Sequence, residues 1–388
     1  MGLILSSENV VDFLAKHQML PPDFQPDAPI VREEGTNFNL VVRAATGKNL
    51  LVKQNRIGTQ SVATKSSPEW VVQTLIDTFE LVAIQPLVSQ VLLSDSSSCT
   101  LVSVFYENYI SLDRLYTNTQ NFAQQIAFTM GANLAQVHST TYQQQQHYEF
   151  LTRNLKLEVG ELPNFIRRLN SLDPSVFARI CPDGLEFYKL YQRFPSLNQS
   201  VLELFAQIQP SCLIHNDLTL DNFIVDRQLV LDSTQIKPEQ VKIIDWERSK
   251  WGDPAVDLGM VVAEYVGGIW LGNLVVDREL DINTILRLAP VPLETLLPSL
   301  QAFVRGYLTT FPQIISHRPD FIRRVVQFAG IGILDRLSYY VEHHYHFHNN
   351  SLCKLQVAKN LICTPGESIG TVFGATEAEL TELSSGVV

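Results

Sequence analysis

Apolar and polar residues follow a pattern that predicts a β-rich first part of the chain. Apolar, β-branched runs at residues 38–44 and 49–54 are separated by a Thr-Gly-Lys turn, which is typical of a β-hairpin. Residues 66–81 carry apolar side chains at near-helical spacing after a Ser-Pro start, so a helix is expected there. Two more strands are expected at 89–95 and 99–107.

The remainder of the chain is predicted to be mostly helical. A short helix is expected at 7–18, and the proline-rich stretch 21–29 stops it because proline lacks an amide donor. After residue 108, helical patterns occupy the following ranges: 121–139, 184–208, 292–310 and 319–345. Three short apolar strands are expected among them: FIVD (223–226), LVLD (229–232) and VKIID (241–245). The tail 364–388 is small, acidic and nearly free of aromatic residues, so weak order is expected.

Composition favours a folded protein without a polyanionic partner. With 29 basic and 40 acidic residues the formal charge is −11, and this negative field would repel nucleic acid. Hydrophobic residues make up 45% of the chain, enough for a sizeable core. Five scattered cysteines suggest no disulfide framework or zinc site, so a cytoplasmic location is expected. No apolar run approaches the ~20 residues of a membrane span, and no secretory signal is recognised, so no membrane association is expected.

The residues that could carry chemistry gather in two neighbouring segments. His215 to Asn222 reads HNDLTLDN, and Asp245 follows 23 residues after Asn222 in IIDWE. Phosphoryl transfer needs a carboxylate to take the proton of the accepting hydroxyl and oxygen ligands to hold Mg²⁺ between phosphates. Asp217 would be the base, and Asn222 and Asp245 would be the metal ligands. His215 would brace the loop by hydrogen bonding.

These motifs resemble those of the aminoglycoside phosphotransferase and choline kinase superfamily, which has a protein-kinase-like fold. The pattern H-x-D-x-x-x-x-N matches from His215 to Asn222, I-D-W-E stands where protein kinases have D-F-G, and G-D-P-x-x-D-L follows. The resemblance covers residues 30–345. It implies an α+β fold with two lobes, a small β-rich lobe (1–107) that binds nucleotide and a larger, mostly helical lobe (108–363) for catalysis and acceptor binding, followed by the tail.

In such a fold the small lobe supplies the nucleotide site. The resemblance assigns Lys53, near the end of the second hairpin strand, to the α- and β-phosphates of ATP. Glu69, at the start of the next helix, is the best candidate to pair with Lys53 and hold it extended. Glu80, at the far end of that helix, is the other candidate.

The phosphate-covering loop and the hinge complete the expected nucleotide site. Protein kinases have three glycines in this loop, whereas this chain has only Gly35, followed by Thr36 and Asn37. These three residues resemble the reduced loop often found in this superfamily. Backbone amides of such a turn can still hold phosphate oxygens, although an ordinary hairpin turn has the same composition. Backbone groups around Phe105 and Glu107 should form the hinge that meets the adenine.

Two departures from protein kinases favour a small-molecule acceptor. Thr219 stands where a Ser/Thr kinase has a lysine, and Asp257 follows Asp245 by only twelve residues, with no A-P-E afterwards, which leaves no room for a peptide-docking activation loop. The expected function is therefore an ATP- and Mg²⁺-dependent O-phosphotransferase that acts on a small alcohol. The acidic balance leans toward a cationic acceptor, such as an amino sugar or amino alcohol.

Two other functions stay open on the sequence. The reduced glycine loop would suit a nucleotide-binding pseudokinase or regulatory protein, although such a protein needs no catalytic carboxylates. A tailoring kinase that modifies a peptide is the other alternative, because the helices and the tail could hold a longer acceptor. The histidines at 343–348 are not interpreted as a metal site, since no carboxylate or cysteine completes a ligand set.

Overall fold

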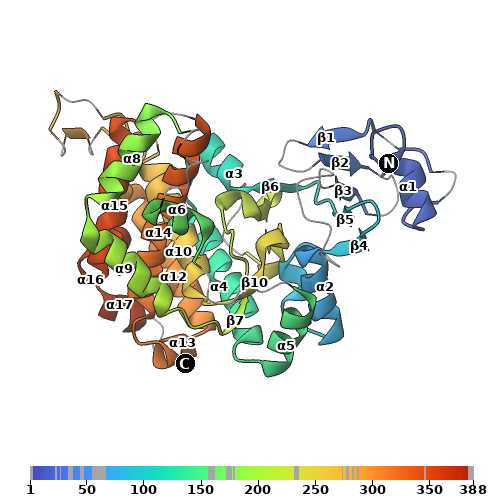
Figure 1. Ribbon diagram of the computed structural model, residues 1–388. Helices are drawn as coiled ribbons and strands as arrows, with labels where there is room; N and C mark the ends of the chain where they lie inside the picture. The colour runs from blue at the N-terminus through green and yellow to red at the C-terminus, as the bar shows by residue number, and fades with distance from the viewer. Residues whose placement is uncertain are drawn as a thin grey trace.

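A computed structural model of the chain separates a small lobe, built around a sheet, from a larger and mostly helical lobe (Figure 1). The two-lobe α+β architecture expected from the sequence is thus confirmed. The structure describes these residues: 3–21, 24–26, 28–33, 38–43, 48–54, 67–155, 162–171, 177, 180–230, 236–272, 274–276, 279–281, 284–285, 288–344 and 347–382.

An antiparallel sheet forms the centre of the small lobe. In the described part of the chain its strands are, in spatial order, β1 (Val31–Glu33), β2 (Phe38–Val42), β3 (Leu50–Gln54), β5 (Thr100–Val104) and β4 (Val91–Asp95). The hairpin predicted from the sequence is β2–β3, with Leu40 opposite Val52. Successive side chains of a strand point to opposite faces, so Val52 and Gln54 are buried on one face of the sheet and Lys53 lies on the other.

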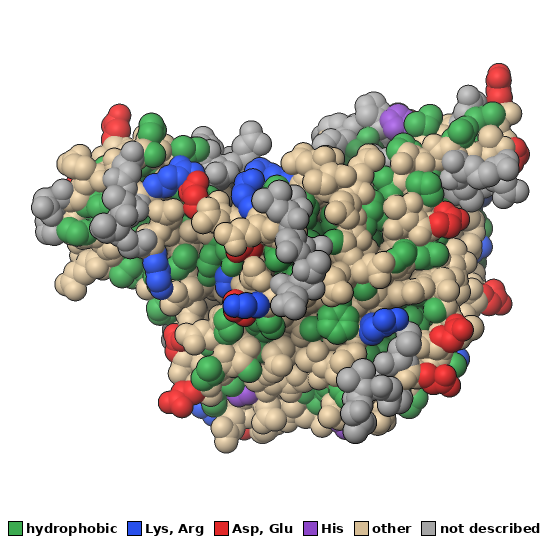
Figure 2. Space-filling model, turned by 180° about the vertical axis from the view of Figure 1, so that it is seen from behind, with side chains coloured by type: hydrophobic (Ala, Val, Ile, Leu, Met, Phe, Trp, Pro, Cys, Tyr) green, Lys and Arg blue, Asp and Glu red, His purple; other side chains and the backbone are tan. Residues whose placement is uncertain are grey.

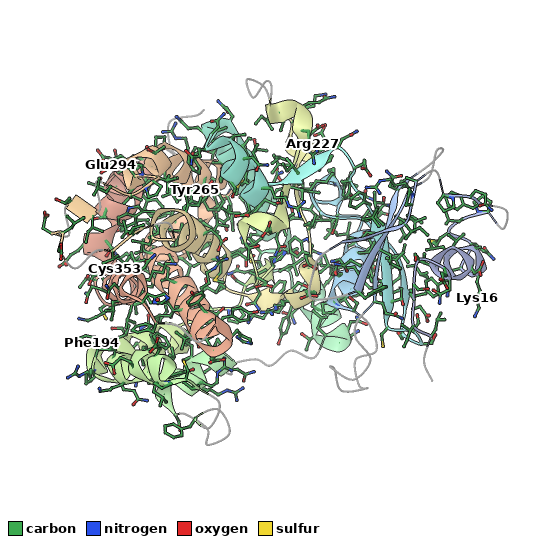
Figure 3. All side chains as sticks on the ribbon, turned by 90° about the horizontal axis from the view of Figure 1, so that it is seen from above. Lys16, Phe194, Arg227, Tyr265, Glu294 and Cys353 are labelled. Carbon is green, nitrogen blue, oxygen red and sulfur yellow. The ribbon has the colours of Figure 1, made fainter. Side chains whose placement is uncertain are left out.

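Helix α1 (Val10–Lys16) covers the face of the sheet opposite to Lys53. Its residues Val10, Phe13 and Leu14 fall at helical spacing and pack with Val52 and the other apolar residues of that face. Figure 3 shows Lys16, the last residue of α1, at the outer end of the small lobe. The other face of the sheet is therefore turned toward the larger lobe.

Helix α2 (Pro68–Thr78) lies between the sheet and the larger lobe, where Figure 1 shows it beside α5 (Gln145–Asn154). Just past its end, the ring of Phe79 lies 4.6 Å from that of His147 and 5.8 Å from that of Phe150, both on α5. The helix that carries Glu69 is therefore held by both lobes.

Helices make up most of the larger lobe. Besides α5 they are α3 (Leu112–Thr119), α4 (Gln124–Thr141), α6 (Asn164–Asn170), α8 (Pro182–Gln192), α9 (Pro195–Ala206), α10 (Ala255–Ala263), α12 (Leu293–Thr310), α13 (Gln313–His317), α14 (Phe321–His344), α15 (Asn349–Cys363), α16 (Pro365–Phe373) and α17 (Glu377–Glu382). A π-helix, η6 (Glu264–Trp270), continues α10. Among the described residues, no helix is long and apolar enough to cross a membrane.

Helices α4 and α12 approach each other unusually closely. A Cβ atom at Gly131 of α4 would lie 1.9 Å from the carbonyl oxygen of Phe303, and one at Gly306 of α12 would lie 2.0 Å from that of Phe128. Only glycine fits at these two positions, because any side chain would collide with the backbone of the other helix. The pair forms a rigid support beneath the segments that carry the polar motifs.

Two small sheets hold those segments at the centre of the molecule. One contains β6 (Tyr109–Ser111), β8 (Phe223–Asp226) and β9 (Val241–Ile243), and the other contains β7 (Cys212–Ile214) and β10 (Lys250–Gly252). The strands expected in FIVD and VKIID are therefore β8 and β9. The strand expected in LVLD is wrong for its first residues, because Leu229 belongs to the 3₁₀ turn η3 (Arg227–Val230); residues 231–235 lie outside the described part.

Two helical expectations also differ from the structure. The range 184–208 contains two helices, α8 and α9, because Pro195 begins a new helix and cannot continue the old one. The expectation of weak order in the tail is wrong for 365–382, which form α16 and α17. Their few apolar residues are placed so that Val372 and Phe373 are buried against the larger lobe, and this packing compensates for the low hydrophobic content.

Candidate active site

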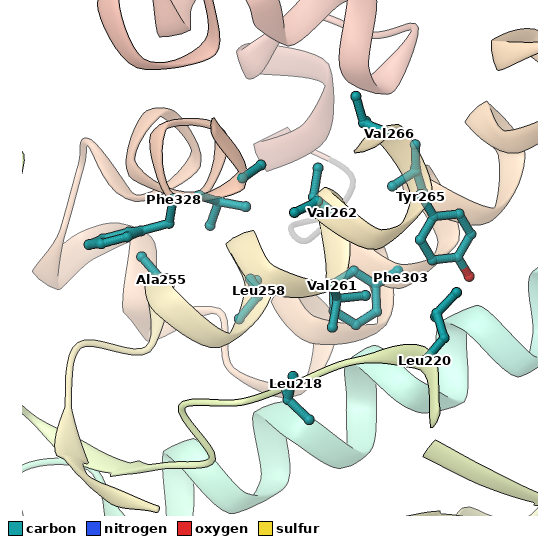
Figure 4. Close-up of a cluster of buried hydrophobic side chains, with 14 of the residues drawn as sticks. Leu218, Leu220, Ala255, Leu258, Val261, Val262, Tyr265, Val266, Phe303 and Phe328 are labelled. Carbon is teal, nitrogen blue, oxygen red and sulfur yellow. The ribbon is translucent and has the colours of Figure 1, made fainter. Parts of the chain in front are cut away.

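The segment from His215 to Asn222 connects β7 to β8 and lies on the core of the larger lobe. Its side chains alternate: Leu218 and Leu220 are buried, whereas Asp217 and Thr219 are partly exposed. Figure 4 shows the two leucines beside the apolar residues of α10. The leucines anchor the segment, so the polar side chains between them are directed away from the core.

A buried carboxylate on α10 sets the backbone of this segment. Asp257 accepts hydrogen bonds from the backbone amides of His215, at 2.7 Å, and Asn216, at 2.8 Å. Asn216 has a φ of 64°, in the left-handed region that non-glycine residues rarely adopt. The imidazole Nε2 of His215 lies 2.8 Å from the carbonyl oxygen of Ile244, so His215 ties this segment to the one that contains Asp245.

Asn222 is held in a defined orientation beside Asp217. Its side-chain Nδ2 donates to the carbonyl oxygen of Asp217 at 2.8 Å, and its own carbonyl oxygen accepts from the amide of Ile244 at 2.9 Å. Because Nδ2 is used in this bond, the amide oxygen Oδ1 points the other way and can accept or bind a cation. The two motifs are thereby fixed side by side.

Lys53 of the small lobe reaches the same place. Its Nζ donates to Oδ1 of Asp245 at 2.7 Å and to Oε1 of Glu69 at 3.2 Å. Lys53 and Asp245 are 192 positions apart in the sequence, so this contact joins the two lobes. The surface is hollowed where the lobes meet, and Lys and Arg side chains lie beside the hollow (Figure 2).

Two effects determine the pKa values in this cluster: burial, and the position of the Lys53 ammonium between the carboxylates of Glu69 and Asp245. Burial alone would lower the pKa of Lys53, but the charges of Glu69 and Asp245 outweigh burial and raise the pKa well above its ordinary value. Burial raises the pKa of Glu69 to about 6, because the attraction of Lys53 offsets only part of the desolvation and Asp245 adds repulsion. The lysine is held charged between two carboxylates.

The structure distinguishes the two glutamates considered from the sequence. Glu69 lies in the first turn of α2 and contacts Lys53, whereas Glu80 lies beyond the end of the helix and is exposed. A helix of eleven residues is about 16 Å long at 1.5 Å per residue, so its two ends cannot serve the same lysine. Glu69 is the residue that pairs with Lys53.

The structure describes only some of the other residues that were expected to bind the nucleotide. Gly35, Thr36 and Asn37 lie outside the described residues. The amide of Phe105 donates to the carbonyl oxygen of Asn49 at 2.8 Å, so this hinge donor is already used within the small lobe. The carboxylate of Glu107 pairs with the guanidinium of Arg43 at 2.7 and 3.1 Å, which holds the hinge to the residue that follows β2.

Charged residues that the motifs did not indicate lie close to Asp217. Arg248 lies 3.3 Å from Asp217, and Arg336 of α14 pairs with Glu264. Asp335, also on α14, interacts electrostatically with Arg248 and Asp217, and burial raises its pKa to about 6. The only sequence signal for Asp335 is a carboxylate that directly follows the mostly apolar stretch 325–334.

The structure offers no competing metal site in the part of the chain that it describes. No three side chains among His, Cys, Asp and Glu gather there as metal ligands, and residues 345–346 of the histidine cluster lie outside it. His343 instead stacks on Tyr339, with ring centroids 4.1 Å apart. The oxygen ligands of Asn222 and Asp245 stay the candidates for a cation.

The two-lobe fold and the lysine–carboxylate cluster across it define the class of protein as kinase-like. The chain matches the phosphotransferase enzyme family (APH) over residues 84–288, more than half of its length, so it belongs to this family and is a phosphotransferase. The family expected from the sequence is thus confirmed.

Solved structures support the same fold. A Plasmodium vivax ethanolamine kinase superposes with a TM-score of 0.55 and 15% identity, over 89% of this chain and 85% of the other. The GDP complex of an aminoglycoside 2'-phosphotransferase mutant superposes with a TM-score of 0.50 and 12% identity, over 95% of this chain and 100% of the other. At such identities the likeness concerns the fold. A search of curated proteins found no match.

Proposed function

We propose that the protein transfers the γ-phosphoryl group of ATP to a hydroxyl group of a small molecule, with Mg²⁺ bound. The observation that carries this proposal is the cluster in which Lys53 of the small lobe meets Asp245 of the larger lobe, beside Asn222 and Asp217. No disulfide joins the five cysteines, all of which the structure describes, and this agrees with a cytoplasmic location.

Lys53 is suited to hold the nucleotide. An ammonium group has three donors, and Glu69 and Asp245 take two of them among the described residues, so one donor is left for a phosphate oxygen. The raised pKa of Lys53 keeps it charged over the physiological range, so it can attract the phosphates electrostatically. The bound nucleotide of the aminoglycoside 2'-phosphotransferase neighbour is GDP, so GTP should be tested beside ATP.

Asn222 and Asp245 fit a magnesium ion. The Nδ2 bond of Asn222 leaves its Oδ1 available, and Lys53 uses only Oδ1 of Asp245, so one oxygen of each residue can bind a cation. Two protein oxygens, with phosphates and waters completing the shell, are the usual way in which proteins hold Mg²⁺ at a nucleotide. The bound ion would neutralise charge on the phosphate oxygens during transfer.

Asp217 would receive the proton of the acceptor. As the acceptor oxygen forms its bond to the γ-phosphorus, the bond from that phosphorus to the β–γ bridging oxygen breaks, ADP leaves, and the hydroxyl proton passes to the carboxylate. Asp217 is about one-third exposed, so an acceptor can reach it, although Arg248 contacts one of its oxygens.

A cationic alcohol is the acceptor class that we propose. Asp217 and Asp335 interact electrostatically, so two carboxylates lie near the place where the acceptor would bind. The charges of Arg248 and Arg168 offset only part of the burial of Asp335, so its carboxylate can take a further positively charged partner. An amine on the acceptor would provide that partner. Ethanolamine is the substrate named for the Plasmodium neighbour, which makes amino alcohols and amino sugars the first compounds to test.

The proposal is tested by mixing the protein with Mg²⁺, labelled ATP or GTP, and a panel of amino alcohols and amino sugars. The native chain should phosphorylate at least one compound, and Asp217→Asn should lose about 10²- to 10⁴-fold in rate, the usual contribution of a general base. The matched control Asp221→Asn removes a carboxylate from the same segment, where it accepts a hydrogen bond from Ser111 and interacts electrostatically with Arg336, and it should keep the activity.

Other outcomes would contradict the proposal. Equal transfer by Asp217→Asn would remove Asp217 from the base role. Tight nucleotide binding without transfer to any compound would favour a regulatory, binding-only protein. Phosphate found on a co-expressed peptide rather than on the panel would favour a peptide-tailoring kinase.

A further inference from the structure

A chain of buried hydrogen bonds runs from α12 to the backbone before Asp217. The hydroxyl of Tyr307 lies 2.9 Å from Nδ1 of His138, and Nε2 of His138 lies 3.2 Å from Oδ2 of Asp257. The side chains of Tyr307, His138 and Asp257 have no exposed surface. Asp257 in turn accepts from the two amides that precede Asp217, so four groups far apart in the sequence act in series.

The chemistry of the three side chains assigns a donor and an acceptor to each hydrogen bond in this series. A carboxylate can only accept, so Nε2 of His138 carries a proton. In the tautomer that has its proton on Nε2 alone, Nδ1 accepts the hydroxyl proton of Tyr307. Burial raises the pKa of Tyr307 well above its ordinary value, so the hydroxyl stays a donor. Burial would raise the pKa of Asp257 as well, but the hydrogen bonds from the side chain of His138 and from the backbone amide of His215 lower it, and Asp257 stays ionised.

The residues at the other end of this hydrogen-bond series, His138 and Tyr307, are held by close helix packing. His138 is on α4 and Tyr307 is on α12, directly after Gly306, one of the two glycines where these helices touch. The ring of Tyr307 also stacks on that of Phe321, at 5.7 Å and 18°. The hydroxyl therefore has little freedom to move, and it holds His138 in one tautomer and one orientation.

At the end of this hydrogen-bond series nearest to Asp217, the backbone of Asn216 is left-handed, a conformation that is less favourable for residues with a side chain than for glycine. The φ of Asn216 is 64°, which costs energy for a residue with a side chain, although asparagine tolerates the left-handed region better than most. Asp257 offsets this cost through its bonds to the amides of His215 and Asn216. Because Asp217 is the next residue, the direction of its carboxylate depends on how firmly Asp257 is held.

We propose that His138 and Tyr307 are positioning residues for the base Asp217, which they orient through Asp257. The inference rests on the proposed function, because it takes Asp217 as the base. The hydroxyl of Tyr307 fixes the Nε2–H tautomer of His138, this N–H holds Asp257, and Asp257 holds the left-handed turn before Asp217.

The variant Tyr307→Phe tests this chain, because it removes one hydroxyl and keeps the ring stacking. We expect ADP release from ATP and Mg²⁺, with water as the acceptor, to lose about tenfold in kcat while KM for ATP stays within about twofold. Without any substrate, hydrogen exchange of the amides of His215 and Asn216 should accelerate about fivefold. The control Ser299→Ala removes another buried hydroxyl of α12, which bonds to the carbonyl of Phe122, and should change neither quantity.

The variant His138→Gln separates positioning from stability. Glutamine places an amide N–H near the position of Nε2 and has no tautomers, so it should keep most of kcat. Adding Tyr307→Phe to His138→Gln should then cost less than about half of what Tyr307→Phe costs alone, on a logarithmic scale.

The results separate this inference from the proposed function. Equal effects of Tyr307→Phe and Ser299→Ala on both exchange and kcat, or full additivity with His138→Gln, would overturn the positioning role. Hydrogen exchange needs no turnover. A native protein that transfers no phosphate would therefore refute the proposed function, whereas unchanged exchange in Tyr307→Phe would refute the positioning chain.

Discussion

The change Glu69→Gln should raise stability while it lowers activity. The side chain of Glu69 is only 5% exposed, and burial raises its pKa from 4.5 to about 6. A carboxyl whose pKa is raised by folding costs stability as the pH increases from the unfolded value to the folded value, because the fold must then hold an ionised group that burial disfavours. At 1.36 kcal/mol per pH unit, the interval from 4.5 to about 6 gives a cost of about 2 kcal/mol.

We therefore expect Glu69→Gln to be about 2 kcal/mol more stable than the native chain at pH 8 and equally stable at pH 4.5. Lys53 does not disturb this window, since its raised pKa removes stability only at pH values above 10.5. Urea unfolding without nucleotide, followed by circular dichroism at both pH values, measures the difference. The control Glu80→Gln removes the same charge from an exposed position just beyond the same helix, where water screens it, and should show the same small difference at both pH values.

Glu69→Gln should be less active than the native chain, although it is expected to be more stable. Glutamine keeps an oxygen for Lys53 but not the charge that holds the ammonium toward the phosphates, so kcat/KM for ATP at pH 8 should fall about tenfold. A variant that is less stable than the native chain at pH 8 would show that the Lys53 pair stabilises the fold through Glu69. Such a result would refute the reasoning.

Three further changes test the metal site, the helix crossing and the small lobe. Asp245→Asn should raise the Mg²⁺ concentration for half-maximal activity about 10- to 100-fold, and an unchanged midpoint in a magnesium titration would exclude Asp245 as a ligand. Gly306→Ala should destabilise by about 1–3 kcal/mol because its Cβ would meet a carbonyl oxygen at 2.0 Å, whereas Gly370→Ala, in open space, should not; equal urea midpoints would contradict the close crossing. Gln54→Leu removes the buried amide that bonds the backbone at Leu5, so proteolysis should cut the N-terminal segment faster, and unchanged cutting would count against this anchor.

Local patterns predicted the parts of the site that lie on regular elements. The alternation along residues 50–54 puts Lys53 on the face opposite to Val52, and the Ser-Pro start of the following helix places Glu69 in its first turn. Strands β8 and β9 pair antiparallel, so Asn222, just before β8, and Asp245, just after β9, lie at the same end of the pair. Asp217 is in the same short connection as Asn222.

Contacts between distant segments could not be predicted in this way. Tyr307 and His138 are 169 positions apart, and their bond depends on two glycines that let helices touch, a feature that no local pattern reveals. Asp335 could not be predicted from the sequence, because a carboxylate whose pKa is raised by burial is recognised only from its surroundings in the fold. The tail was misjudged since its composition is poor in apolar residues, whereas Phe373 shows that a few well-placed ones suffice.

A crystal structure of the chain with magnesium and a non-hydrolysable ATP analogue tests the central claim most directly. We expect Lys53 to contact the α- and β-phosphates, Asn222 and Asp245 to bind the metal, and the γ-phosphate to face Asp217. A nucleotide outside the hollow between the lobes, or a metal ion held without Asn222 and Asp245, would contradict it.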